Sequence, residues 1–416
     1  MTALARPGGP ALEVADVLRA HGAAYRAAHP VSPEQAAVMR HLTACRTAAL
    51  GGHVDTCARC GFVQISYNSC RDRHCPKCQA SAREQWIEAR LDRVLPVEHF
   101  HVVFTLPEDL KPLVLRNQAA LYGLLFTAAS RTLLDLAADP KRLGAQAGLT
   151  AVLHTWGQNL LFHPHLHCVV TAGGLSADGS RWVPARQDYL FPVQVMGRLF
   201  RGKFLAGLQA LYAEGRLAFS GSTAGLADPP AFAALRDCLY RQDWVVYAKL
   251  PFGGTEQVFR YLGRYSHRVA IANSRLVALQ DGVVAFRWKD YRDGNRWKVM
   301  RLAAEEFIRR FLLHVLPKRF VRIRHYGLLA GRNVDGPLQQ ARRLLELAEP
   351  ASETPPSFAM HAAPGSAPTP AGEDALRLCP CCQGPLIRRP LGDGARSGRP
   401  SPLARAAPRA PPPDSS

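Results

Sequence analysis

Apolar positions along the chain recur with two different periods, so the sequence predicts both helices and strands. A period of three to four residues predicts helices over residues 82–94, 113–136, 197–211, 231–239, 256–266 and 303–313. Two-residue alternation and short β-branched runs predict strands over residues 99–107, 150–157, 165–172, 243–249, 274–279 and 283–289. Helices mixed in this way with neighbouring strands predict an α+β fold.

Two short connections predict antiparallel hairpins. Residues 157–164, GQNLLFHP, join the strands predicted over residues 150–157 and 165–172. Asp281 and Gly282 separate the next pair. An Asp-Gly pair is favoured in two-residue hairpin turns because both positions need a positive φ.

Composition changes along the chain and predicts four parts. Residues 1–40 form a helical lead-in, residues 41–95 a cysteine-rich module, and residues 96–345 a larger α+β domain. Over residues 346–416 Pro, Ala, Ser and Gly dominate. Such a segment buries too little apolar surface to offset the entropy of ordering, so we expect a mostly disordered tail.

The charge balance adds a partner to this picture. The 416 residues include 52 Lys and Arg against 33 Asp and Glu, a net charge of +19, and 47% are hydrophobic, enough for two or three domains. Lys and Arg bind nucleic acid by displacing the counterions of its phosphates, so DNA is the expected partner. Arginine enrichment from a GC-rich genome is the alternative explanation.

The sequence predicts a cytoplasmic bacterial protein with no membrane partner. No apolar run approaches the roughly 18 residues that cross a bilayer, and the N-terminus lacks the hydrophobic stretch of a signal peptide. The eleven cysteines are then expected to be reduced. Six of them lie between Cys45 and Cys78, which favours metal binding over disulfides.

The cysteine-rich module has the spacing of a zinc ribbon. Two Cys-x2-Cys pairs, Cys57–Cys60 and Cys75–Cys78, are separated by fourteen residues. Each pair forms a tight turn that points two sulfurs at one ion, so these four residues are the predicted ligands of a structural Zn²⁺. Three neighbours stay open as alternative ligands: Cys70, His74 and His53.

Two other cysteine features are predicted to be unimportant for this site. Cys45 is expected to be a small buried residue. Cys379 and Cys382 repeat the Cys-x2-Cys spacing, but no second pair follows them. Because one pair cannot complete a tetrahedral site, we expect a degenerate remnant or a weak site there.

The strand predicted over residues 165–172 carries a candidate catalytic metal site. His165 and His167 are two residues apart, so both project from one face of a strand. Either Gln158 or His154 can supply a third ligand from the facing strand or its turn, and Gln158 is favoured. Imidazoles suit zinc or manganese better than magnesium, but phosphate oxygens in the shell make Mg²⁺ or Mn²⁺ reasonable.

A tyrosine pair is the second candidate for chemistry. Tyr261 and Tyr265 have helical i,i+4 spacing, so both hydroxyls can emerge on one face. A neighbouring stripe of cations is expected to bind DNA: Arg260, Arg264 and Arg268. Phenols with a pKa near 10 are poor nucleophiles unless cations or a metal-bound phosphate activate the reaction. The alternative is an aromatic packing pair with solvent-exposed arginines.

These motifs together resemble a known family. FTLP at 104–107, HPHLHCVV at 163–170 and YLGRYSHRVAIANSRL at 261–276 resemble the HUH-type, two-tyrosine transposases of rolling-circle insertion sequences. The cysteine block resembles the zinc-binding domain that precedes the catalytic domain in that family. FRWKDYRDG at 286–294 and RIRHYGLLAGR at 322–332 resemble its later stretches, so the resemblance covers roughly residues 35 to 335.

The resemblance implies a mechanism. An HUH nuclease domain with a central antiparallel sheet and flanking helices would hold the metal through His165 and His167. Tyr261 and Tyr265 would each form a 5′-phosphotyrosine, one to nick the element and one to transfer the strand. No ATP is needed, and no P-loop is present in the sequence.

The resemblance also implies a substrate, which is single-stranded DNA of element ends and target. Aromatic residues that can stack bases are Trp156, Trp182, Trp288 and Tyr291, and cations that can bind phosphates are Arg287, Lys289 and Arg292. Core packing is the alternative role for each of them.

Two other functions stay open. A metal-dependent hydrolase would use the two histidines with water as the nucleophile, although the βα repeats of a barrel hydrolase are absent from the sequence. A non-catalytic zinc-ribbon protein, either a decayed transposase or a regulator, would bind DNA without cutting it.

Overall fold

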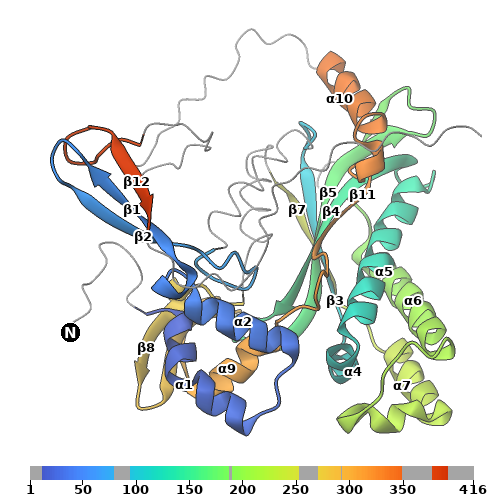
Figure 1. Ribbon diagram of the computed structural model, residues 1–416. Helices are drawn as coiled ribbons and strands as arrows, with labels where there is room; N and C mark the ends of the chain where they lie inside the picture. Colours follow the sequence, from blue (N-terminus) through green and yellow to red (C-terminus); the bar gives the residue numbers. More distant parts are fainter. Residues whose placement is uncertain are drawn as a thin grey trace, which may run out of the picture. The chain divides into compact units, whose positions relative to one another are not determined.

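The computed structural model describes residues 12–78, 94–186, 190–252, 270–291, 293–348 and 377–391. Its chain divides into two compact units (Figure 1). Unit 1 comprises residues 1–43 and 71–362, and unit 2 comprises residues 44–70 and 363–416. Helices and antiparallel sheets occur together, so the predicted α+β class is confirmed.

Among the described residues, unit 1 contains the α-helices, apart from the last residue of α2, and two of three sheets. Its helices are α1 (Val14–Ala28), α2 (Pro33–Ala44), α4 (Lys111–Arg116), α5 (Gln118–Ala138), α6 (Val193–Ala213), α7 (Pro229–Arg241), α9 (Ala304–Leu312) and α10 (Pro337–Ala348). Its strands are β3 (His99–Thr105), β4 (Ala145–Trp156), β5 (Phe162–Ser176), β6 (Trp182–Pro184), β7 (Val246–Phe252), β8 (Leu276–Gln280), β9 (Val283–Asp290), β10 (Arg296–Ala303) and β11 (Ile323–Gly327).

The central sheet of unit 1 is antiparallel throughout its described pairings. Its strands lie in the order β11-β4-β5-β3-β7, and β6 pairs with β5 beside that path. The hairpin predicted over residues 150–172 is confirmed as β4 and β5, and both strands are longer than predicted. The helix predicted over residues 113–136 is divided into α4 and α5 at Asn117.

The core of unit 1 lies between the central sheet and the helices α5 and α6 (Figure 1). Alternate residues of β5, including Leu166, Cys168 and Val170, are buried in this core. Phe104 of β3 packs edge-on against Phe200 of α6, with ring centroids 4.9 Å apart. Because strand side chains alternate, the intervening residues of β3, β4 and β5 project from the opposite face of the sheet.

A second sheet in unit 1 has the order β10-β9-β8. The turn predicted at Asp281 and Gly282 joins β8 to β9, and both residues have a positive φ, 49° and 71°. The third strand, β10, was not predicted. Most of its side chains are exposed, although its sequence alternates between polar and apolar residues from Arg296 to Val299.

Unit 2 contains one sheet of three strands in the order β12-β1-β2, namely β12 (Leu386–Pro390), β1 (Gly52–Cys57) and β2 (Val63–Tyr67). The guanidinium of Arg388 donates two hydrogen bonds to the buried carboxylate of Asp55, at 2.7 and 2.6 Å. Residues 377–391 therefore depart from the expected disordered tail, because β12 pairs with β1 along its whole length.

Some predictions lie outside the described residues, namely the helix over 256–266 and all but Val94 of the helix over 82–94. None of the described helices combines the length and the apolar character that a membrane crossing requires. The domain limits predicted at residues 40, 95 and 345 stay predictions.

Candidate functional site

Three histidines come together on the face of the central sheet opposite α5 and α6. One ring nitrogen from each of His154, His165 and His167 lies within 4.8 Å of the other two. His154 of β4 stands directly opposite His165 of β5 in the antiparallel register. The alternation of β5 buries Leu166 in the core between the two predicted ligands, so His165 and His167 do project together.

Hydrogen bonding determines which nitrogen of His165 can bind a metal. Its Nδ1 lies 2.7 Å from the carbonyl oxygen of His163, and Nδ1 carries the proton because a carbonyl only accepts. Its Nε2 therefore offers a lone pair, 3.1 Å from Nε2 of His167. Burial, with a smaller effect of His163, lowers the pKa of His165 to about 4, so the ring is neutral near pH 7.

A fourth histidine, His101 of the neighbouring strand β3, contacts His167. Its Nε2 is 2.9 Å from Nδ1 of His167, and the two rings stack with centroids 5.1 Å apart. Burial and the nearby Lys249 lower the pKa of His101 to about 3, which keeps it neutral. His101 was not among the predicted ligands, although its alternation with Phe100 and Val102 is a signal that indicates a shared strand face.

Acid is expected to destabilise unit 1, because several of its histidines are held neutral. Burial is the largest cause that lowers the pKa of His99, His165 and His314 to about 4 and that of His101 to about 3. In the unfolded chain each pKa returns to about 6.5, so below that pH the unfolded state binds more protons. The contribution of each neutral histidine to the free energy of unfolding is fully present above pH 6.5. It is lost as the pH falls to about 4, by on the order of 2–3 kcal/mol per histidine.

Urea unfolding followed by tryptophan fluorescence from about pH 8 to pH 4.5 measures this loss. A His99→Phe variant removes one of the four groups and should lose less stability over the same range. A midpoint that does not change between about pH 7.5 and pH 5 would contradict the prediction.

The third ligand was predicted to be Gln158, with His154 as the alternative, and the structure brings His154 to the pair. The amide nitrogen of Gln158 donates to Oη of Tyr291 at 3.0 Å. Its Oε1 is buried and has no hydrogen-bond partner among the described residues. Since a buried oxygen of this kind can still serve a cation, Gln158 stays a prediction as an additional ligand.

The donor set fits a divalent ion. An ion about 2.1 Å from two imidazole nitrogens holds them about 3.0–3.4 Å apart, and Nε2 of His165 and Nε2 of His167 are 3.1 Å apart. Three imidazole ligands would leave further positions for substrate oxygens or water, as in a catalytic site. The identity of the ion, Mg²⁺ or Mn²⁺, stays a prediction.

Hydrogen bonds connect the β8–β9–β10 sheet to the loop after β4. Besides the bond from Gln158 to Tyr291, Arg275 donates to the carbonyl oxygens of Gln158 at 2.5 Å and Arg287 at 2.6 Å. Lys289 of β9 lies opposite Trp297 of β10, and its Nζ is 5.9 Å from the ring centroid of Tyr291. Both Tyr291 and Trp297 are 62% exposed, so this sheet presents aromatic rings beside cations.

The other aromatic residues predicted to stack on DNA bases are less exposed. Trp156 is half-buried and stacks on His154, with ring centroids 4.7 Å apart. Trp182 is half-buried and packs against a small core cluster, and Trp288 is half-buried as well. Trp297 was not among the predicted aromatic residues, because β10 itself was not predicted.

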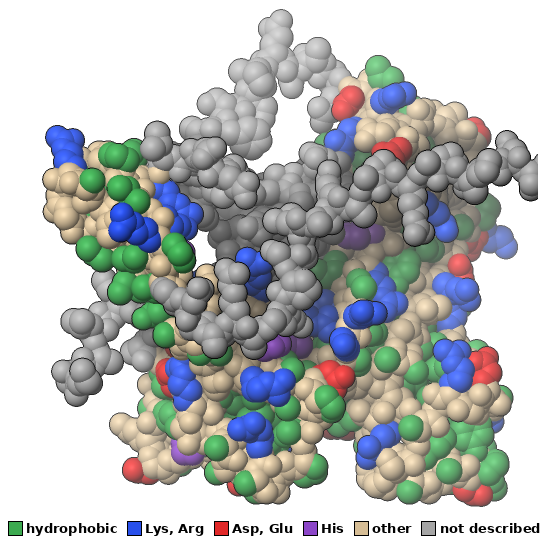
Figure 2. Space-filling view, in the orientation of Figure 1, with side chains coloured by type: hydrophobic (Ala, Val, Ile, Leu, Met, Phe, Trp, Pro, Cys, Tyr) green, Lys and Arg blue, Asp and Glu red, His purple; other side chains and the backbone are tan. Residues whose placement is uncertain are grey.

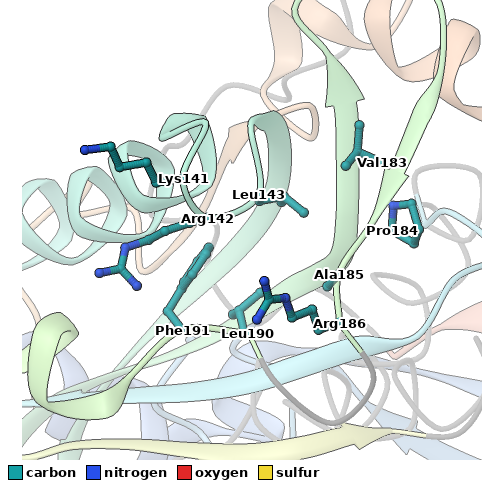
Figure 3. A pocket seen from close by; sticks show the side chains of 9 residues that line it. All are labelled: Lys141, Arg142, Leu143, Val183, Pro184, Ala185, Arg186, Leu190 and Phe191. Carbon is teal, nitrogen blue, oxygen red and sulfur yellow. The ribbon is translucent and has the colours of Figure 1, made fainter.

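A cationic pocket of about 260 Å³ lies apart from the histidines in unit 1 (Figure 3). Its lining includes the cations Lys141, Arg142 and Arg186 and the apolar side chains Leu143, Leu190 and Phe191. None of the three clustered histidines lines it. Lys and Arg side chains are spread over the face drawn in Figure 2 rather than gathered in one patch, in keeping with a polyanionic partner.

The tyrosine pair lies outside the described residues, as do Arg260, Arg264, Arg268 and Arg292. The described chain reaches Phe252 at the end of β7 and resumes at Ala270. β7 pairs with β3, which pairs in turn with the histidine-bearing β5. The chain therefore enters the segment of Tyr261 and Tyr265 directly from the central sheet.

Two of the predicted zinc ligands lie in a group of four cysteines within unit 2. The Sγ atoms of Cys57, Cys60, Cys379 and Cys382 all lie within 4.8 Å of one another. The prediction of one site from Cys57, Cys60, Cys75 and Cys78 is corrected accordingly, since Cys57 and Cys60 lie with the C-terminal pair. Strand pairing is the reason, because β12 pairs with β1 and brings two distant Cys-x2-Cys pairs together.

The residues left open as alternative ligands, Cys70, His53 and His74, lie outside this group, as does Cys45. His74 has other partners, since its Nδ1 is 3.0 Å from a carboxylate oxygen of Asp72 and its Nε2 accepts from the N–H of Leu316.

Comparison with known proteins identifies the chain. A family model described as “Transposase zinc-binding domain” matches residues 17–106, and one described as “Putative transposase” matches residues 148–335. The chain is 51% identical over 392 residues to “Putative transposase y4qJ” of Sinorhizobium fredii (strain NBRC 101917 / NGR234), covering 92% of this chain and 96% of that protein. The chain belongs to this family of insertion-sequence transposases.

A second relative supports the same family. The transposase is 30% identical over 325 residues to the “Transposase for insertion sequence element IS801” of Pseudomonas savastanoi pv. phaseolicola, covering 74% of this chain and 73% of that protein. No solved structure matches the transposase. The predicted resemblance is confirmed, and the transposase is a DNA-processing enzyme with a zinc-binding domain. The three clustered histidines lie within residues 148–335, whereas Cys379 and Cys382 lie beyond both matched ranges.

Proposed function

We propose that the transposase nicks and joins single-stranded DNA through covalent phosphotyrosine links. The observation that supports this most directly is the group of three histidines on one face of the central sheet. Its donors suit a phosphate-bound divalent ion, and the sequence supplies two tyrosines soon after a strand of the same sheet. Two nucleophiles allow strand transfer as well as nicking.

The histidines would position the scissile phosphate. A divalent ion held by His154, His165 and His167 would supply Lewis-acid stabilisation of the charge that develops on the phosphate oxygens. His167 would bind through Nε2 and donate from Nδ1 to His101, which fixes the orientation of its ring. The carbonyl of His163 has the same role for His165.

The tyrosines would exchange phosphoester bonds. Oη of Tyr261 or Tyr265 attacks the phosphorus, the new O–P bond forms, and the bond from phosphorus to the 3′ oxygen breaks. The phenol proton ends on that oxygen, which leaves a 5′-phosphotyrosine and a free 3′-hydroxyl. A 3′-hydroxyl can then attack the phosphotyrosine and release the tyrosine. Cations beside the tyrosines would stabilise the phenolate: Arg260, Arg264 and Arg268.

Single-stranded DNA fits the surface of the β8–β9–β10 sheet. Unstacked bases can lie on the exposed rings of Tyr291 and Trp297, while Arg287 and Lys289 pair with phosphates. The hydrogen bond from Gln158 to Tyr291 connects this surface to the loop that leaves His154. The sugar-phosphate backbone of DNA whose bases bind there would lie near the histidine-bearing strands.

The test is a covalent adduct. We expect the full-length protein, incubated with labelled single-stranded oligonucleotides that span element ends and with Mg²⁺ or Mn²⁺, to form a protein–DNA adduct that survives denaturation. EDTA should abolish it, and fully paired duplexes of the same sequence should give little. Cleavage without an adduct would favour the hydrolase alternative, and binding without cleavage the non-catalytic one.

A further inference from the structure

Two chain reversals of unit 2 have matching hydrogen bonds. In the first, the N–H of Cys57 donates to the carbonyl five residues ahead at 2.8 Å, and the N–H of Gly61 donates back to the carbonyl of Cys57 at 3.0 Å. In the second, Cys379 and Gln383 make the same two bonds at 2.8 and 2.9 Å. Gly61 and Gln383 both have a positive φ, 73° and 57°. Both segments therefore fold as the same Cys-x2-Cys turn.

The two turns face each other through their sulfurs. Sγ of Cys57 lies 3.5 Å from Sγ of Cys382, and Sγ of Cys60 lies 3.5 Å from Sγ of Cys379. Four sulfurs about 2.3 Å from one tetrahedral zinc ion are about 3.8 Å apart, close to these values. A disulfide would need about 2.05 Å, and all four cysteines are free thiols.

Gly384 leaves the space beside the sulfurs open. A Cβ atom at this position would lie 3.3 Å from Sγ of Cys382 and 3.4 Å from Sγ of Cys57. A side chain there would press on two of the four sulfurs. The absence of a side chain at Gly384 therefore leaves the positions of these sulfurs undisturbed.

Backbone amides favour the thiolate form that a metal needs. In the second turn the N–H of Cys381 donates to Sγ of Cys379 at 3.4 Å. This sulfur is therefore oriented by the backbone of its own turn.

Strand pairing holds the second turn in place. Leu386 at the start of β12 lies opposite Cys57 at the end of β1, and four further residue pairs continue this register. The bidentate hydrogen bond between the charged side chains of Arg388 and the buried Asp55 stabilises the same register. Strand pairing thus brings together two pairs of sulfurs that are 325 and 319 positions apart in the chain.

We infer that Cys57, Cys60, Cys379 and Cys382 bind one structural zinc ion. Residues 377–391 are then the second half of a zinc ribbon whose first half is residues 52–67. The match to the transposase zinc-binding domain ends at residue 106 and so covers only the first half of this ribbon. The C-terminal Cys-x2-Cys pair is a required part of the zinc-binding region and not a remnant.

Zinc content of the purified full-length protein tests the site. We expect the Cys379→Ser plus Cys382→Ser variant to lose about one zinc ion per chain. Adding Cys57→Ser and Cys60→Ser to it should remove no more, since all four residues serve one ion. Cys381→Ser is the matched control, because this exposed cysteine lies between the two ligands but outside the sulfur group, and it should keep the wild-type content.

A substitution that keeps a ligand tests the site without relying on loss of the metal. In cobalt-loaded protein, Cys382→His should retain the ion and lower the thiolate-to-cobalt absorbance of this site by about a quarter, one thiolate of four. Cys381→His should leave the spectrum unchanged. The inference is overturned if both double-serine and histidine variants of the C-terminal pair keep the wild-type zinc content and spectrum while Cys57→Ser loses zinc.

Discussion

Replacement of His165 by alanine is expected to lower the rate of DNA nicking by at least about a thousand-fold, while DNA binding changes by no more than about two-fold. His165 is central to the histidine group, because its Nε2 is 3.1 Å from Nε2 of His167 and its strand position is opposite His154. Loss of this ring removes one of three predicted metal ligands. Single-turnover cleavage of a labelled oligonucleotide, with binding measured separately, gives both quantities.

The matched control is His163→Ala. His163 lies on the same strand two residues earlier, and its contribution to the site is a backbone carbonyl that the substitution keeps. It is expected to retain nicking within about ten-fold of wild type. Equal losses in the His163 and His165 variants would show that the site does not depend on this histidine as a ligand.

Replacement of both Tyr261 and Tyr265 by phenylalanine is expected to lower covalent adduct formation by at least about ten-thousand-fold, since no phenol remains to accept the phosphate. Each single variant keeps one nucleophile. One of the two should still nick DNA but fail to join the cut strand to a second one. Nicking and joining of differently labelled oligonucleotides on one denaturing gel separate the two steps.

Tyr291→Phe is the control for this experiment. Tyr291 is exposed and accepts a hydrogen bond from Gln158, so its loss should weaken DNA binding modestly and leave adduct formation in place. An adduct that persists in the double variant, or one that is lost in the Tyr291 variant alone, contradicts the assignment of the nucleophiles.

Local geometry explains which parts of the site the sequence could predict. The side chains of His165 and His167 share a face because strand alternation needs no information beyond their spacing. The choice between His154 and Gln158 depended on the register of the hairpin. A register shift in β4 follows His154, so counting along the strand cannot tell how Gln158 relates to β5.

Nonlocal pairing explains what the sequence could not predict. β12 consists of five residues in a region rich in proline and glycine, and its partner strand lies more than 300 positions earlier. No periodicity or spacing rule connects Cys382 with Cys57, so the two Cys-x2-Cys pairs nearest in sequence were assigned to each other. β10 is a different case, because the alternation of Trp297, Lys298 and Val299 is a strand pattern that the sequence does carry.

The pairing of β12 with β1 also orders events during protein synthesis. β1 emerges from the ribosome early, but the strand that completes its sheet is translated only after the whole histidine-bearing domain. A nascent chain that stops before residue 377 therefore carries the three clustered histidines without the complete three-stranded sheet. The three-stranded sheet can therefore form only after the transposase domain has been translated.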